Sequence, residues 1–389
     1  MLDDAGVVRA LRQSRDDGQP APGGGSGRRR WSRAGVAAVV GALTFGVAGV
    51  LSGQLIDERG GVLGALEWLL RTLVVIGACL FIVGGLVVVF RLRKLVRPRP
   101  LGWLIALAVA LVFAWFVAVP IGFGVYLTHL PLRREVRDAD LGTRKQAVSL
   151  PGADSIRLRG WYVPSRNRAA VIALHGTASN RLGVERHARM LARHGYGVLA
   201  LDLPGHGESD GRSTSAPWTM DDDVAAAVQW LAAHKDVSPN KVALLGVSMG
   251  AEVAVRVAAR RRGDVRATVA EGLRGGAKDA SAAGESWLGV AQLAVLGAVG
   301  SVLTGASAGS DADLVERIAP RPLMLISAGT GVEADINRVF VRRASGSTQH
   351  WNLPDAAHAS AIRTDPQGYE RRVIRFLDRA LSVRPVPGR

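Results

Sequence analysis

The hydrophobic pattern of the chain changes near residue 140. Before that point, three long apolar runs carry no charged residue, at 34–56, 72–90 and 100–130. After it, short apolar runs alternate with longer segments of helical periodicity. Long uncharged runs are typical of membrane-spanning helices, and the alternating pattern is typical of a mostly parallel sheet covered by helices. The sequence therefore predicts a membrane region followed by an α/β domain.

The three runs predict transmembrane helices at about 34–56, 72–90 and 101–127, because each reaches the ~20 residues needed to cross a ~30 Å hydrocarbon layer. Residues 1–33 are polar and basic, which predicts a disordered tail. Arginine is concentrated in this tail and in the loop between the second and third runs, so both are expected in the cytoplasm. We therefore expect a multi-pass protein of the cell membrane whose domain after residue 130 is extracytoplasmic.

Composition and charge limit the binding partners and the cofactors that the chain could use. The chain of 389 residues has a formal net charge of +16, carried mostly by arginine. Many of these charges flank the apolar runs, and no basic segment is interleaved with aromatic residues as in a nucleic-acid-binding groove. We therefore expect contact with a lipid bilayer and no binding of nucleic acid. The single cysteine, Cys79, excludes a disulfide within one chain. Since no phosphate-binding glycine loop or metal-ligand cluster stands out, the sequence predicts no cofactor and no metal.

The domain over residues 131–389 is expected to be built from seven short strands. We place them at about 156–163, 170–174, 197–202, 242–247, 267–271, 321–327 and 348–353. Helices are expected at 184–194, from Asp221, after Ser248 and at 369–381. Because strands and helices alternate, the sheet should be mostly parallel with helices on both faces.

One of these strands runs into the pentapeptide Gly246-Val-Ser-Met-Gly, and a helical pattern follows. A serine at such a sharp turn has its hydroxyl exposed above the sheet. The backbone N–H groups at the start of the following helix face a developing negative charge. The pattern therefore makes Ser248 a candidate nucleophile.

Five ordered segments carry a resemblance to a known family. They are Leu174-His-Gly-Thr, Asp202-Leu-Pro-Gly-His-Gly-Glu-Ser-Asp-Gly, Gly246-Val-Ser-Met-Gly, Pro322-Leu-Met-Leu-Ile-Ser-Ala-Gly and Pro354-Asp-Ala-Ala-His. In this order, the region from Gly160 to Leu381 resembles the α/β-hydrolases, in the branch with monoacylglycerol-lipase-like and serine-aminopeptidase-like members. One departure is Pro204, where relatives often carry arginine. The resemblance implies an α/β-hydrolase fold with a helical lid, and a catalytic triad.

The resemblance assigns the remaining members of the triad. His358 matches the catalytic histidine, which would take the proton of Ser248 and pass it to the leaving group. The acid should follow the strand that ends near Ser327, but its usual spacing is missing. Glu333 comes nearer to the strand end and is preferred, with Asp335 as the alternative. Either carboxylate could instead cap the helix that follows.

The oxyanion hole needs two backbone N–H donors, which the resemblance places at Met249 and Thr177. The remaining polar residues near the motifs have plainer interpretations. His175 and His206 are expected to hold loop geometry, and Asp202 and Ser209 to be scaffold. His187 and His194 are expected to face solvent on a helix.

An insert over about 273–315 occupies the place of the lid in this fold. Its uncharged run from Ser286 to Gly305 is long enough to span a bilayer. A crossing there would put Ser248 and His358 on opposite sides of the membrane, so we expect a lid that covers an apolar substrate group. Ordinary packing of this segment against the sheet is the alternative.

Together these features predict a membrane-anchored serine hydrolase. It would cleave carboxylic ester or lipid-like acyl substrates through an acyl-enzyme on Ser248, so an esterase or lipase is preferred. One alternative is a serine peptidase or aminopeptidase with the same triad. A second is a catalytically inactive binding module, and a third is a membrane sensor or transport accessory.

Overall fold

A computed structural model of the chain describes residues 99–113, 119–129 and 134–383, except 213, 308, 345 and 347. Positions 84, 87, 91 and 115 are also described. The predicted tail at 1–33 and the first predicted span at 34–56 lie outside these residues. The second predicted span, at 72–90, is outside them except for two isolated positions. These three predictions therefore stay predictions.

The domain is built on a single sheet of eight strands in the order β1-β2-β4-β3-β5-β6-β7-β8. The strands are β1 (Gln146–Pro151), β2 (Arg157–Val163), β3 (Ala170–Leu174), β4 (Gly197–Leu201), β5 (Val242–Val247), β6 (Ala267–Glu271), β7 (Leu323–Ala328) and β8 (Thr348–Leu353). β2 pairs antiparallel with both β1 and β4, and the remaining neighbours are parallel. The parallel part confirms the expectation, and β1 is a strand that the sequence analysis did not predict.

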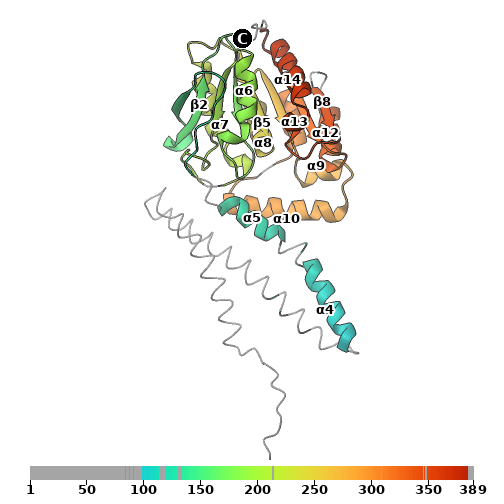
Figure 1. Ribbon diagram of the computed structural model, residues 1–389. Coiled ribbons are helices and arrows are strands. Elements are labelled where there is room, and N and C mark those ends of the chain that lie inside the picture. Colours follow the sequence, from blue (N-terminus) through green and yellow to red (C-terminus); the bar gives the residue numbers. More distant parts are fainter. Residues whose placement is uncertain are drawn as a thin grey trace, which may run out of the picture. The chain divides into compact units, whose positions relative to one another are not determined.

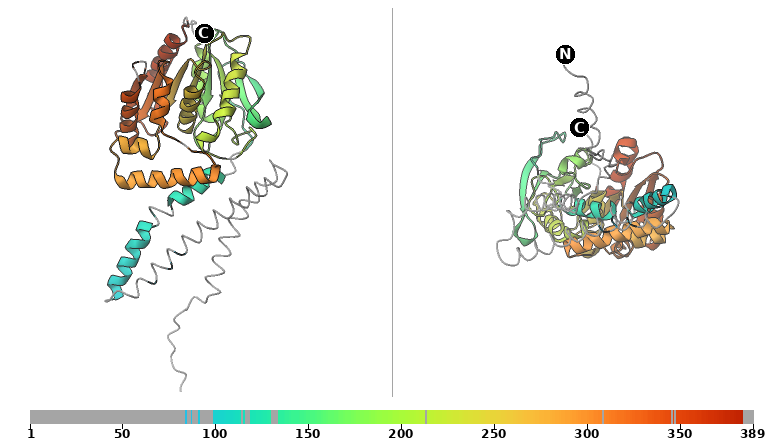
Figure 2. Two further views of the ribbon diagram at one scale, coloured as in Figure 1. Left: turned by 180° about the vertical axis from the view of Figure 1, so that it is seen from behind. Right: turned by 90° about the horizontal axis from the view of Figure 1, so that it is seen from below.

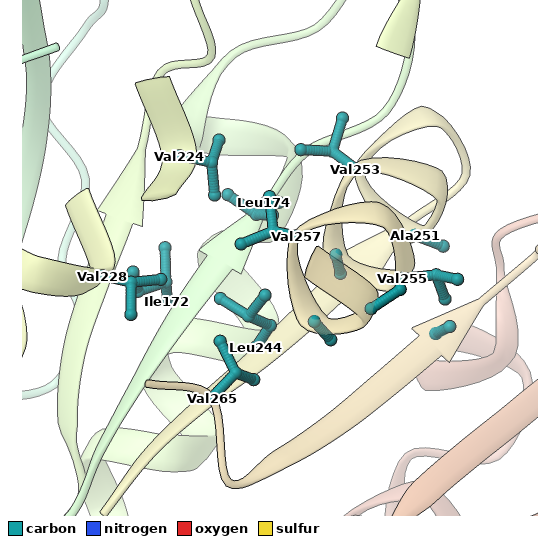
Figure 3. Packing of buried hydrophobic residues seen from close by; sticks show 14 of the residues in the cluster. Ile172, Leu174, Val224, Val228, Leu244, Ala251, Val253, Val255, Val257 and Val265 are labelled. Carbon is teal, nitrogen blue, oxygen red and sulfur yellow. The ribbon is translucent and has the colours of Figure 1, made fainter. Parts of the chain in front are cut away.

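Helices cover both faces of this sheet (Figure 1). They are α6 (Glu185–Arg193), α7 (Asp221–Ala232), α8 (Met249–Arg260), α12 (Val332–Arg343), α13 (Ala361–Thr364) and α14 (Pro366–Ala380). Alternate residues of β3 point to opposite faces, so Ile172 joins the core beneath α7, α8 and α12, and Val171 joins the core beneath α6 and α14. Figure 3 shows the first core, where Leu244 of β5 lies beside Val257 of α8. This two-sided burial explains why β3, β4 and β5 carry no polar side chain.

The connection between β6 and β7 forms the predicted insert. It contains α9 (Ala277–Ala282), α10 (Trp287–Thr304) and α11 (Asp311–Ile318). The side chain of Trp218 contacts the insert, because its Nε1 donates a hydrogen bond of 2.9 Å to Thr304 Oγ1. Among the described residues, only α10 is both long and apolar enough to cross a membrane.

The third predicted span is described as two helices, α4 (Arg99–Phe113) and α5 (Val119–His129). Of the residues between them, only Trp115 is described. α5 packs against α10 (Figures 1 and 2). At the contact, a Cβ built on Gly124 would come within 2.6 Å of Val299 Cγ1, so only a glycine allows this close approach. Gln292 Nε2 also donates to Trp115 O over 2.9 Å.

Candidate active site

Ser248 occupies a strained turn between β5 and α8. Its backbone angles are φ 55° and ψ −119°, a conformation that L-residues rarely adopt. The turn is tight enough that a Cβ on Gly246 would lie 2.0 Å from Gly250 O, and one on Gly250 would lie 2.3 Å from Leu174 O. The two glycines of the motif are therefore required by backbone packing. The turn leaves the serine side chain half-buried at the carboxyl end of the sheet.

A continuous hydrogen-bonded chain runs from this serine to a carboxylate. Ser248 Oγ lies 2.9 Å from His358 Nε2, and His358 Nδ1 lies 2.5 Å from Glu333 Oε2. With its proton on Nδ1, the His358 ring donates to Glu333 and accepts from Ser248. The three side chains come from the β5–α8 turn, the loop after β8 and the first turn of α12. The sheet therefore brings together residues that are up to 110 positions apart in the chain.

Of the two acids that the sequence left open, only Glu333 contacts His358. Its other oxygen, Oε1, accepts a 2.8 Å hydrogen bond from the N–H of Ala328, which fixes the carboxylate from both sides. The Glu333 side chain is 9% exposed, whereas that of Asp335 is 42% exposed and pairs with Arg338 on the surface of α12. The two carboxylates are separated by two positions, which turns them to different faces of the helix.

The two segments that carry the candidate oxyanion donors lie next to Ser248. Met249 is the first residue of α8, so its N–H has no acceptor within the helix. Thr177 lies in the exposed turn after β3, and the preceding Gly176 is close to the nucleophile, since a Cβ built there would lie 3.3 Å from Ser248 Cβ. The candidate oxyanion donors Thr177 and Met249 are thus in segments that border the serine.

Comparisons with known proteins bear on the fold of this domain. Residues 165–318 match the sequence model of the family described as serine aminopeptidase, S33. The esterase Pf2001 of Pyrococcus furiosus superposes with a TM-score of 0.53 at 26% sequence identity, over 64% of this chain and 99% of that one. The α/β hydrolase GrgF from Penicillium superposes with a TM-score of 0.51 at 19% identity, over 62% of this chain and all of its own. The domain has the α/β-hydrolase fold.

Relatives of this α/β-hydrolase domain also occur among bacterial proteins. The uncharacterized protein Rv2307c of Mycobacterium tuberculosis is 37% identical over 113 residues, which are 28% of this chain and 39% of that protein. The chain therefore matches about two fifths of the length of this mycobacterial relative. The uncharacterized protein YfhR of Escherichia coli is 26% identical over 247 residues, which are 61% of this chain and 82% of YfhR.

The loop after β4 in the α/β-hydrolase domain is held by a buried carboxylate. Asp202 accepts hydrogen bonds from the N–H of Arg181 (2.7 Å), from Arg181 Nη1 (2.6 Å) and from the N–H of Glu208 (2.9 Å). Ser209 Oγ donates to Asp202 O over 2.7 Å. Burial raises the pKa of Asp202, and the hydrogen bonds from the N–H of Glu208 and from Arg181 offset part of this rise. As predicted, Asp202 and Ser209 serve as scaffold.

The two histidines near the motifs are buried and neutral. Burial, together with the nearby His206, lowers the pKa of His175 to about 3. Burial likewise lowers the pKa of His206 to about 4. His175 Nε2 accepts the N–H of Leu203 over 3.1 Å, and His206 Nδ1 lies 2.9 Å from Pro204 O. Both rings therefore hold the loop after β4, as the sequence predicted.

One prediction about a histidine was wrong. His187 was expected to face solvent on its helix, but it is 3% exposed and its Nε2 lies 3.3 Å from Glu271 Oε2. The sequence contained one indication of this pair, because Glu271 is a lone acid at the end of an otherwise uncharged strand. His194 is partly exposed, in line with the prediction, and contacts Glu370 on α14. Within the described part of the chain, no His, Cys, Asp and Glu side chains gather into a metal-binding group.

Proposed function

We propose that the chain is a membrane-anchored serine hydrolase that cleaves carboxylic esters or lipid-like acyl substrates through an acyl-enzyme on Ser248. The observation that carries this proposal is the hydrogen-bonded chain from Ser248 Oγ through His358 to Glu333. A serine hydroxyl needs an adjacent base to become nucleophilic, and the base needs a partner that fixes its tautomer. The three side chains supply these roles in that order.

In the proposed reaction, Ser248 Oγ attacks the substrate carbonyl carbon while His358 Nε2 takes the hydroxyl proton. Glu333 keeps the imidazole oriented and stabilises its positive charge. The N–H groups of Met249 and Thr177 donate to the oxyanion. His358 then passes its proton to the leaving alcohol, and the acyl group stays on Ser248. A water molecule, deprotonated by His358, attacks this ester and releases the acid with the serine restored.

Two observations favour an ester with an apolar acyl part. The Pyrococcus furiosus protein that shares the fold at 26% identity is described as an esterase. The insert between β6 and β7 is dominated by the uncharged α10, with the Trp287 side chain 77% exposed. A second candidate, a peptidase acting through the same triad, is favoured by the match to the serine aminopeptidase family.

A fluorophosphonate probe tests the proposed nucleophile. The full-length chain in detergent should be labelled, and Ser248→Ala should not, whereas Ser149→Ala on the exposed β1 should be labelled like the wild type. Turnover of a panel of p-nitrophenyl esters and aminoacyl amides then separates the ester from the peptide reaction. A wild type that resists the probe, or equal labelling of Ser248→Ala, would leave the inactive binding module as the better interpretation.

The membrane part of the proposal rests on exposed apolar side chains, within the third predicted span (α4) and on the helix that packs against it (α10). In α4, the side chains of Leu104 and Leu111 are 63% and 61% exposed. In α10, which packs on α5, Val302 is 64% exposed, and only Gly300 and Leu303 are buried. A helix that is apolar on every side is stable in a protein core or in lipid, and most of this one is not in a core. We infer that α10 lies against the bilayer, on its extracytoplasmic side.

An environment-sensitive fluorophore tests this contact. In a Cys79→Ser background, the dye is attached at Val302→Cys and, as a control, at Arg371→Cys on α14. With the full-length chain in phosphatidylcholine and phosphatidylglycerol vesicles, lipids that carry a shallow nitroxide should quench the dye at 302 and not at 371. Equal, weak quenching at both positions would contradict lipid contact. An alkaline phosphatase fused after residue 389 should be active only if the domain is extracytoplasmic.

A further inference from the structure

Glu271 lies directly behind the candidate active site. It is the last residue of β6, which pairs with β5 and β7, and its side chain is 2% exposed. Its backbone oxygen accepts the N–H of Ser248 over 2.8 Å. One end of this residue therefore supports the strained turn that carries the proposed nucleophile.

The side chain of Glu271 supports the segment that carries the proposed base. Its Oε1 accepts a 2.9 Å hydrogen bond from the N–H of Ala361, which is three residues after His358. Its Oε2 faces His187 Nε2 at 3.3 Å. Tyr369 of α14 packs edge-on against the His187 ring, with 5.4 Å between the ring centroids, and its hydroxyl also interacts with the Glu271 carboxylate. The carboxylate thus links the loop after β8 to α6 and the core.

The loop that follows His358 needs such support. Ala359 has a φ of 54°, a strained conformation for a residue with a Cβ, and Ser360, at the N-cap position of the short helix α13, makes no side-chain bond to a helix N–H. His358 also lies close to the backbone after Glu271, since a Cβ built on Gly272 would be 2.9 Å from His358 Cε1. A strained segment persists only where its surroundings hold it, and here the surroundings are Glu271 and Gly272.

We propose that Glu271 is a positioning residue for the reaction, which sets the separation of Ser248 and His358 by holding the backbone of the first and the loop of the second. This inference rests on the proposed function. Glu271 does not reach the substrate, and it acts through the two residues it holds. His187 is its partner, which fixes the direction of the carboxylate.

The charge state of Glu271 fits this role. Burial by itself would raise the pKa of this carboxyl group, but the hydrogen bonds from His187 and from the Ala361 N–H lower it overall. A buried carboxylate is tolerated only where such partners satisfy it. As an anion, Glu271 accepts a stronger hydrogen bond from Ala361 than a neutral group would.

Glu271→Ala tests the proposal in the full-length chain. A displacement of about 1 Å between reacting groups costs about 100-fold in rate, so kcat per site titrated with the fluorophosphonate should fall by about that factor. KM should stay within about 2-fold, since the substrate contacts are untouched. Glu271→Gln keeps an oxygen that can accept the Ala361 N–H, so it should recover most of the lost rate. An unchanged kcat in Glu271→Ala overturns the proposal.

A matched control separates positioning from ordinary stabilisation. Asp223 on α7 is also a buried carboxylate that accepts a backbone N–H, that of Ala153 over 2.7 Å, but it holds a turn beside β1 and β2. Asp223→Ala should lower the melting temperature and leave kcat per titrated site unchanged. An equal loss of kcat in both variants would mean that Glu271 acts only through general stability, which also overturns the proposal.

Hydrogen–deuterium exchange provides a test that needs no activity. In Glu271→Ala, peptides that cover residues 357–364 should exchange faster than in the wild type, while in Asp223→Ala they should not. If Glu271→Ala does not fold, the same comparison is made with Glu271→Gln and His187→Phe, where a smaller increase is expected. Absence of probe labelling in the wild type would refute the proposed hydrolase, whereas unchanged exchange in this segment would refute the positioning role alone.

Discussion

Strands β3 to β5 and helix α10 are all uncharged and apolar, yet the strands and the helix have opposite surroundings. Val171 and Ile172 of β3 are fully buried, each in a different core. In α10, Trp287 is 77% exposed and Val302 is 64% exposed. Hydrophobicity alone therefore does not determine whether a segment is buried in the protein core or exposed on its surface. The strands lie between two layers of helices, whereas α10 meets α5, α9 and Trp218 and reaches the first core only partly, through Val290 and Leu293, among the residues that the structure describes.

The comparison extends to chemistry, because the polar side chains that could act on a substrate lie in the turns, loops and helix start that follow the carboxyl ends of the strands. We expect the largest effect there. Glu333→Gln keeps the shape of the side chain but removes its charge, and should lower kcat about 10⁴-fold, as in triads whose acid is neutralised. Asp335→Asn, two residues away and paired with Arg338, should stay within about 2-fold. Ester turnover by the two variants measures this, and the reverse order would make Asp335 the acid.

Truncating one apolar side chain in each region should change the free energy of unfolding by different amounts, and this effect is smaller than the change in kcat. Leu244→Ala removes a fully buried side chain from β5, and large-to-small changes of this kind cost about 2–5 kcal/mol in the free energy of unfolding. Val302→Ala removes exposed methyl groups from α10 and should cost less than about 0.5 kcal/mol in detergent. Denaturant unfolding of the full-length chain measures both. Similar losses would show that α10 is packed like the sheet.

The sequence was sufficient for the parallel part of the fold and for Ser248, and the family resemblance added His358. Strands β3 to β5 are short apolar runs between turn residues, so their positions follow from the pattern of apolar and turn residues along the chain. The Gly246-Val-Ser-Met-Gly turn fixes Ser248, because only such small neighbours allow the chain to turn there. The strand β1 was missed because it lies at the edge of the sheet and Leu150 is its only buried residue.

The remaining residues could not be predicted because their partners are distant in the chain. His187 looked like a surface residue of a polar helix, and its partner Glu271 is 84 positions away. Periodicity indicates which face of a helix is buried, but it does not indicate which polar side chain finds a partner there. The choice between Glu333 and Asp335 likewise depends on the direction in which α12 leaves β7, which local spacing does not determine.

The place of Glu333 on a helix has a consequence for variation among related chains. The Glu333 side chain extends from the first turn of α12, and its Oε1 accepts the N–H of Ala328. The linker Gly329-Thr-Gly, which joins Ala328 to the helix, makes no hydrogen bond to either carboxylate oxygen. Gly329 is itself held, because its N–H donates to Leu353 O over 2.9 Å and its O accepts from Asn352 Nδ2 over 3.1 Å, so variation is expected at Thr330 and Gly331 as long as the helix keeps its angle to the sheet. Homologues that differ in this linker should therefore retain a glutamate at the second position of the helix, while an aspartate, shorter by one methylene, would need a linker that moves the helix inward.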